Sequence, residues 1–319
     1  MAASDLEIGV FLSSEEMGPN ELVKTGALAA SLGFTDLSVS DHFHPWVDEQ
    51  GHSPFVWSVL GGLAGIDGVS LGTGVTCPTM RIHPAILAQA AATTAAMADG
   101  RFWFGIGSGE NLNEHILGDR WPPADVRLSM LAESVQVMRE LWSGDEVSFD
   151  GEHYLVENAR IYDLPAEPPP IMVSAFGPKA AKVAAEIGDG LVTTSPDSEA
   201  ISTYRDNGGK GPVITLTKMC WDEDEARARK TFRRLWPNSG VPGELSQELR
   251  TPALFEQAAE VVTEEDAVGS TPCGPDPEVH AESLRKMAEA GVTKVHLQQV
   301  GSNHEAAYTF VRDEVLPRL

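Results

Sequence analysis

The segment that follows the second predicted strand combines a carboxylate, two imidazoles and a large aromatic ring. It reads Ser40-Asp41-His42-Phe43-His44-Pro45-Trp46. An imidazole beside a carboxylate can take up and release a proton near neutral pH, so we interpret His42 as a proton-transfer residue backed by Asp41. Trp46 would form a wall against a planar ligand. The alternative is that the segment has no catalytic role and is a capped loop in which the histidine only forms structural hydrogen bonds.

The two histidines of this segment also raise the question of a metal site. His42 and His44 form a His-x-His pair of the kind that metal-dependent barrel hydrolases use. Such hydrolases need further ligands at later strand ends. His296 lies inside the last predicted strand, but the sequence between offers no convincing set. We therefore keep a metal-dependent hydrolase only as an alternative and expect no metal.

Two further predicted strand ends are rich in small residues. After the third strand, Gly74-Val75-Thr76-Cys77-Pro78 could let the backbone approach a flat ring, or could be a structural turn. After the fourth, Gly105-Ile106-Gly107-Ser108-Gly109 leads to one carboxylate and two amides, on Glu110, Asn111 and Asn113. This pattern is not the dinucleotide-binding fingerprint, because it does not follow the first strand and no acidic residue stands at the required distance.

A fourth candidate turn follows the fifth strand of the predicted barrel. Ala175, Phe176, Gly177 and Pro178 lead into a helix, and Lys179 comes next. The free backbone N–H groups at a helix N-terminus attract anions, so a cofactor phosphate could bind there with help from Lys179. An ordinary connecting loop is equally compatible with the pattern.

Short apolar runs that alternate with helical stretches must position these segments. We predict strands at 6–12, 36–40, 69–75, 101–105, 171–174, 190–194, 213–219 and 294–298. Helices are predicted at 20–32, 54–63, 84–100, 124–142, 179–187, 222–235, 277–290 and 303–318. Strands alternating with helices indicate parallel βαβ units, and this number of units predicts an α/β fold of the (β/α)₈ TIM-barrel type. An open doubly wound sheet is the second choice.

Two segments interrupt this alternation. Residues 147–163 predict a β-hairpin that turns at Asp150-Gly151 after the fourth helix, and residues 237–270 predict a helical insertion late in the barrel. We expect one domain over 1–319.

Composition limits the partners of the chain. The formal net charge is −24, which argues against a nucleic-acid partner and against anionic membranes. No run approaches the ~18 apolar residues of a membrane span. Three cysteines are too few for a disulfide framework. The first seven residues do not resemble a secretion signal. We expect a soluble, cytoplasmic protein that acts on a small molecule.

The motifs occur together and in the order of one superfamily. SDHFHPW, LGTGVTCPT, GIGSGENLNEH, LWSGDEVSFDGEHY and AFGPKAAK resemble the luciferase-like flavin/deazaflavin superfamily, most closely its F420-dependent glucose-6-phosphate dehydrogenase group. The resemblance implies a bacterial-luciferase-like barrel, coenzyme F420 and a homodimer. An FMN-dependent luciferase-like monooxygenase is the alternative within the superfamily.

The resemblance also implies roles for individual residues. The deazaflavin would lie over a bulge at Gly74-Val75, where the superfamily often has a non-prolyl cis peptide. His42 would take the hydroxyl proton of the substrate while hydride passes to C5, and Glu110 would act near N1 of the reduced ring. Trp46 and Glu15 would contact the substrate. The remaining coenzyme residues would be Asp41, Thr76, Cys77, Ser108, Gly109 and Asn113, with Ala175, Phe176, Gly177 and Pro178 at the phosphate.

The chain departs from this group where sugar phosphates are bound. Members clamp the phosphate with Lys and Arg, whereas here the corresponding region, 197–205, is poor in basic residues and Gln257 stands where a lysine would be useful. Arg205 remains as a candidate for binding the substrate. We therefore predict hydride transfer at the alcohol carbon of a sugar, a sugar phosphate or another alcohol, without strict specificity for glucose 6-phosphate.

Overall fold

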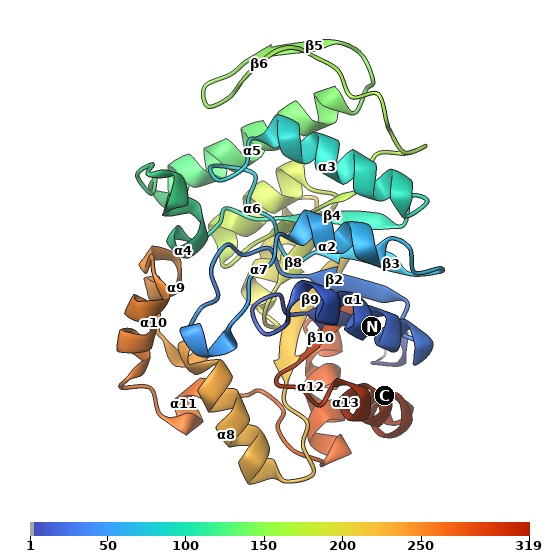
Figure 1. Cartoon of the computed structure of the whole chain (residues 1–319), viewed down its shortest axis with the longest axis vertical. Coiled ribbons are helices and arrows are strands. Elements are labelled where there is room, and N and C mark those ends of the chain that lie inside the picture. The colour runs from blue at the N-terminus through green and yellow to red at the C-terminus, as the bar shows by residue number, and fades with distance from the viewer. Residues whose placement is uncertain (1–2) are drawn as a thin grey trace.

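Eight parallel strands close into a barrel in the order β1-β10-β9-β8-β7-β4-β3-β2 (Figure 1). The computed structural model describes residues 3–319, so the first two residues of the predicted N-terminal segment lie outside it. The strands are β1 (Glu7–Leu12), β2 (Asp36–Val39), β3 (Ser70–Thr73), β4 (Phe102–Ile106), β7 (Ile171–Ser174), β8 (Gly190–Thr193), β9 (Val213–Met219) and β10 (Lys294–Gln299). The prediction of a TIM barrel is confirmed, and the open sheet is wrong because β1 pairs with both β2 and β10.

Helices surround the barrel and return the chain to the next strand. They are α1 (Pro19–Ser31), α2 (Val56–Leu63), α3 (Pro84–Met97), α4 (Asn111–Glu114), α5 (Ala124–Leu141), α6 (Pro178–Ile187), α7 (Ser198–Asp206), α8 (Glu225–Leu235), α12 (Pro277–Glu289) and α13 (His304–Phe310). Proline opens α1, α3, α6 and α12, since its fixed φ and missing N–H suit the first helical position. The sequence did not locate α4 or α7. A π-helical turn at Val311–Val315 and a 3₁₀ turn at Leu316–Arg318 follow α13.

Two insertions decorate the barrel (Figure 1). The hairpin of β5 (Val147–Asp150) and β6 (Leu155–Ala159) follows α5, where the sequence placed it. Tyr154 joins the hairpin to the loop after β3, because its hydroxyl donates a hydrogen bond to the carbonyl of Thr79 at 3.0 Å. The second insertion comprises α9 (Leu245–Glu248), α10 (Pro252–Ala259) and α11 (Glu264–Val268), and it confirms a helical segment between α8 and α12.

Side chains fill the barrel interior. Trp103, Met172, Ile214 and Leu216 pack there as one apolar cluster. Gly72 leaves the room that the ring of Trp103 needs, since a Cβ atom at Gly72 would lie 2.0 Å from it. The interior is therefore a packed core, and a ligand has space only at the barrel ends.

A polar cluster closes the amino-terminal end of the barrel. Asp36 accepts a hydrogen bond from Nε1 of Trp103 at 3.1 Å and pairs with Lys294. Nε2 of His296 lies 3.6 Å from the Asp36 carboxylate, and its Nδ1 lies 2.8 Å from the hydroxyl of Ser38. Burial alone would raise the pKa of Asp36, but the imidazole of His296 and the ammonium group of Lys294 outweigh it and lower that pKa to about 2. Because these side chains are largely buried, we infer that the cluster stabilises the fold and does not bind a ligand.

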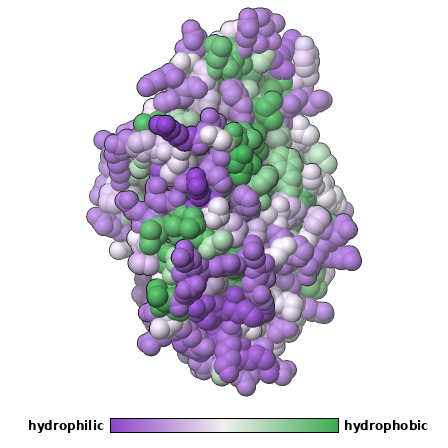
Figure 2. Space-filling model, turned by 60° about the vertical axis from the view of Figure 1, so that its left-hand side comes forward, coloured by the Kyte–Doolittle hydropathy of each residue, from purple (hydrophilic) through white to green (hydrophobic). Residues whose placement is uncertain are grey.

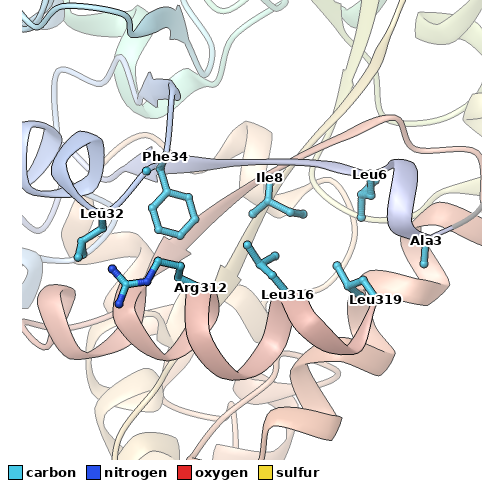
Figure 3. Close-up of a pocket in the computed structure, with 9 residues that line it drawn as sticks. Ala3, Leu6, Ile8, Leu32, Phe34, Arg312, Leu316 and Leu319 are labelled. Atoms are coloured by element: carbon cyan, nitrogen blue, oxygen red, sulfur yellow. The ribbon is translucent and has the colours of Figure 1, made fainter.

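A cavity of about 320 Å³ lies at the same end (Figure 3). Apolar side chains line most of it, including Leu6, Ile8, Phe34 and Leu316, and Arg312 lies along one side. The guanidinium of Arg312 is bound to Asp313. Because the chemistry-bearing loops lie at the opposite, carboxyl-terminal end of the strands, this cavity is separate from the candidate site.

Candidate active site

His42 lies at the carboxyl-terminal end of the barrel beside a carboxylate and an indole ring. Its Nε2 atom is 3.6 Å from Oε1 of Glu15. Its ring centroid is 5.0 Å from that of Trp46. The other ring nitrogen, Nδ1, is 3.3 Å from the carbonyl oxygen of His44. The side chain is 10% exposed, so a ligand at the barrel mouth can reach the ring.

The carboxylate beside His42 belongs to Glu15 and not to Asp41. The hydroxyls of Ser13 and Ser40 each donate to Oε2 of Glu15 at 2.7 Å, which leaves Oε1 directed toward His42. The carboxylate is buried. The interpretation of His42 as backed by Asp41 is therefore wrong, and Glu15, predicted as a substrate contact, is also the partner of the imidazole.

Asp41 points to the neighbouring loop. One carboxylate oxygen accepts a hydrogen bond from the Thr76 hydroxyl at 2.8 Å, and the other accepts one from Nη2 of Arg81 at 2.8 Å. Arg81 also pairs with Glu114, whose carboxylate is 3.5 Å from its Nε. The sequence singled out neither Arg81 nor Glu114, because a buried arginine in a loop has no local signature.

The loop after β4 supports the segment that carries His42. Oδ1 of Asn113 accepts hydrogen bonds from the backbone N–H groups of Phe43 and His44 at 2.9 and 3.1 Å. Its Nδ2 is buried and has no hydrogen-bond partner within residues 3–319. A bound group with an acceptor atom would satisfy it. Ser108 and Glu110 are partly exposed on the same loop.

Backbone geometry lets the loops after β3 and β4 pack closely against each other. The peptide bond between Gly74 and Val75 is cis, as the resemblance implies. Gly109 has a φ of +76°, and a Cβ atom there would lie 2.5 Å from Sγ of Cys77. Burial, with Glu114 nearby, raises the pKa of the Cys77 thiol well above its ordinary value, so this cysteine is a neutral wall and not a thiolate.

The turn after β7 presents a helix N-terminus. Gly177 has a φ of +91° and precedes Pro178 at the start of α6, and no side chain in the described part of the chain caps this helix. Phe176 is 57% exposed. Lys179, predicted to help hold a phosphate, pairs instead with Asp125 on α5.

Aromatic rings from the second half of the chain also lie at the carboxyl-terminal end of the barrel. Phe255 of α10 meets Trp46 edge to face at 5.1 Å. The ammonium group of Lys218, at the end of β9, lies 4.1 Å from the centre of the Trp236 ring. Burial lowers the pKa of Lys218, while Glu15 and Glu16 oppose that change. Figure 2, in which the left-hand side of Figure 1 comes forward, shows green apolar patches between purple hydrophilic regions. The sequence did not identify Phe255, Trp236 or Lys218.

The prediction that Arg205 contacts the substrate is wrong. Arg205 stands in the last turn of α7, and its Nη1 donates to the carbonyls of Gly209 and Gly211 at 3.1 and 2.8 Å. These glycines precede β9, so the guanidinium lies at the amino-terminal end of the barrel. A helix that follows a barrel strand carries its last residues away from the active end.

The two histidines of the His-x-His pair, which the alternative of a metal-dependent hydrolase would use, each lie beside a backbone carbonyl. Nδ1 of His44 lies 2.9 Å from the carbonyl of Leu112, and its ring stacks near that of His115. Within residues 3–319, no group of three or more His, Cys, Asp or Glu side chains is arranged to hold a metal ion.

Comparison with known proteins identifies the family. A family described as luciferase-like monooxygenase matches residues 6–294. The chain belongs to this family. It is 34% identical to the F420-dependent glucose-6-phosphate dehydrogenase of Nakamurella multipartita, over 100% of this chain and 98% of that protein. The enzyme of the same description from Mycolicibacterium smegmatis is also 34% identical, over 99% and 98%.

A solved structure resembles the chain across almost its whole length. An F420-dependent secondary alcohol dehydrogenase in complex with an F420-acetone adduct superposes with a TM-score of 0.91 at 28% identity, over 98% of each chain. Among residues 3–319, no helix has the length and apolar character that a membrane crossing requires.

Proposed function

We propose that this chain is an F420-dependent oxidoreductase that transfers a hydride between an alcohol carbon and C5 of the deazaflavin. The observation that carries this proposal is the pairing of His42 with Glu15, beside the Trp46 ring, at the carboxyl-terminal end of the barrel. The dependence on F420 that relatives at 34% identity carry in their names supports the coenzyme.

The loops of the site fit a flat, polar-edged coenzyme. The coenzyme would contact the loops after β3 and β4 through Gly74, Val75, Thr76, Cys77, Ser108, Gly109 and Asn113. The Nδ2 of Asn113, unpartnered within residues 3–319, would be available to an acceptor atom. The uncapped start of α6 after Ala175–Pro178 would receive its phosphate. When bound, a deazaflavin supplies a hydride acceptor that the protein itself lacks.

Side chains at the carboxyl-terminal end of the barrel would accept and donate the protons of the reaction. His42 would accept the hydroxyl proton of the substrate, and Glu15 would stabilise the imidazolium that results, because its carboxylate is fixed 3.6 Å away. Trp46 would hold the substrate against His42. Glu110, partly exposed on the coenzyme side, would supply a proton to, or stabilise charge on, the reduced ring.

For the substrate we propose an alcohol without a phosphate group. Asp197 caps α7 by accepting hydrogen bonds from the backbone of Glu199 and Ala200, so a carboxylate already occupies this helix N-terminus. Arg205 lies at the other end of the barrel. Lys218 faces Trp236, with two carboxylates near it. The secondary alcohol dehydrogenase with the same fold supports this choice.

A binding and turnover experiment tests the proposal. Purified protein should bind F420, and 2-propanol or cyclohexanol should bleach the visible absorbance of the coenzyme faster than glucose 6-phosphate does. Tight binding of FMN without binding of F420, and oxygen consumption with reduced FMN, would instead support the monooxygenase alternative. Faster reduction by glucose 6-phosphate would overturn the substrate class alone.

We further propose that the chain is one domain that forms a cytoplasmic homodimer. Ile86 and Met97 on the outer surface of α3 are 59% and 52% exposed, and a partner subunit would cover such apolar side chains. Light scattering of the purified protein would give the mass of a dimer, and a monomeric mass would refute this assembly.

A further inference from the structure

Arg81 joins three loops at the active end of the barrel. It lies in the loop after β3, and its side chain is 6% exposed. Its Nη2 donates to Oδ1 of Asp41, after β2, at 2.8 Å. Its backbone N–H donates to Oε2 of Glu114, in α4 after β4, at 2.8 Å, while its Nε lies 3.5 Å from the other oxygen of Glu114. Both carboxylates are buried.

The proposed function assigns the loops after β3 and β4 to the coenzyme, and the resemblance to the family predicts that Asp41, after β2, also contacts it. The second oxygen of Asp41 accepts the Thr76 hydroxyl, so Asp41 is held from two sides. Glu114 directly follows Asn113, which fixes the segment of His42 through two backbone N–H groups. A displacement of Arg81 would therefore alter the loops after β2 and β4 together.

The two buried carboxylates of this cluster, Asp41 and Glu114, share the positive charge of Arg81. A buried carboxylate is stable only when a cation or several donors compensate it. Asp41 depends on Arg81 for this compensation. Burial raises the pKa of Glu114 to about 7, although Arg81 lowers it, while Glu110 and Asp41 raise it further. Burial and, in addition, the charge of Glu114 raise the pKa of the Cys77 thiol and of the Tyr154 phenol. Glu114 can thus tolerate loss of the cation by taking up a proton.

We propose that Arg81 is a positioning residue for the coenzyme site: Glu114 holds its guanidinium, and the guanidinium holds Asp41 in the orientation that receives the deazaflavin. This inference rests on the proposed function. It predicts that Arg81 affects coenzyme affinity through Asp41 and not by itself.

A double-mutant cycle on coenzyme affinity tests this coupling. The Kd for F420 is measured by the change in its fluorescence for the wild type, Arg81→Lys, Asp41→Asn and the double variant. Because lysine lacks the planar fork of arginine, R81K should weaken binding about tenfold, and D41N should weaken it at least as much. The double variant should bind within about threefold of D41N, since coupled residues are not additive. Losses that multiply, or an R81K variant that binds like the wild type, would overturn the inference.

Controls separate this result from a general loss of structure and from failure of the proposed function. Arg139→Lys alters an exposed arginine–carboxylate pair with Asp189 and should leave the Kd unchanged. The KM for the alcohol at saturating coenzyme should be unchanged in R81K. If R81K does not fold, Arg81→Met with Asp41→Asn removes the cation and one anion together and should bind like D41N alone; binding more than about tenfold weaker would overturn the inference. If the wild type itself does not bind F420, the proposed function fails first.

Discussion

Nε2 of His42 lies 3.6 Å from Oε1 of Glu15, although the two residues come from the ends of different strands. Ser13 and Ser40 hold the second oxygen of Glu15, so the carboxylate cannot turn away. A carboxylate fixed in this way orients an imidazole and stabilises its protonated form. The pair is therefore suited to remove a proton from an alcohol while hydride leaves the same carbon.

Replacement of His42 by alanine should lower kcat by about 10²–10⁴-fold, as expected for the loss of a general base. The Kd for F420 should stay within about threefold of the wild type, because the predicted coenzyme contacts come from other residues. Stopped-flow reduction and fluorescence titration measure the two quantities. His153→Ala, in the distant hairpin, is a matched control. A comparable loss of coenzyme affinity in H42A would show that His42 is a coenzyme ligand.

Glu15→Gln should lower kcat by about 10–100-fold while the variant still binds coenzyme. The amide keeps the size of the side chain and removes the charge that stabilises the imidazolium. In a background that already carries His42→Ala, the same change should cost little, since Glu15 would act through the imidazole. Steady-state kinetics of the four proteins provide the test, and full additivity would argue that Glu15 contacts the substrate independently.

Glu114→Gln should stabilise the protein at alkaline pH. The folded-state pKa of Glu114 is raised to about 7, so folding retains a proton that the unfolded chain releases near pH 4.5. The free energy of unfolding therefore decreases as the pH rises from 4.5 to about 7. Above pH 7 the ionised Glu114 lowers it by about 3 kcal/mol. Urea unfolding should show this gain for E114Q at pH 8 and almost none at pH 4. A gain independent of pH would contradict the assignment.

Asp36→Asn should change the acid stability of the barrel. The pKa of Asp36 is lowered to about 2, so its ionised form stabilises the folded state above the unfolded pKa of 3.8. That contribution, about 2 kcal/mol, is lost as the pH falls from about 4 to about 2. D36N should be less stable than the wild type at pH 7, and the difference should shrink toward pH 2 in urea titrations. An equal difference at both pH values would refute the assignment.

Local patterns in the sequence predicted the fold because they reflect local physics. Alternation of apolar strands with helices indicated parallel βαβ units, and the barrel strands lie within a few residues of their predicted bounds. Helix α7 was missed because the Asp197 cap is its only strong local signal and the helix is short, Ser198–Asp206. The hairpin and the insertion at 237–270 followed from breaks in the alternation.

The sequence by itself determined the barrel and the strand ends that carry chemistry, since hydrophobic periodicity and glycine turns are local properties. Only the tertiary structure decided which charged groups meet there. Asp41 and His42 are neighbours in the chain but face different partners, Arg81 and Glu15. Arg205, predicted from the sequence to bind the substrate, is carried by α7 to the opposite end of the barrel. Closure of the barrel brings together loops that are distant in sequence, and burial then makes each pairing depend on geometry that no local pattern encodes.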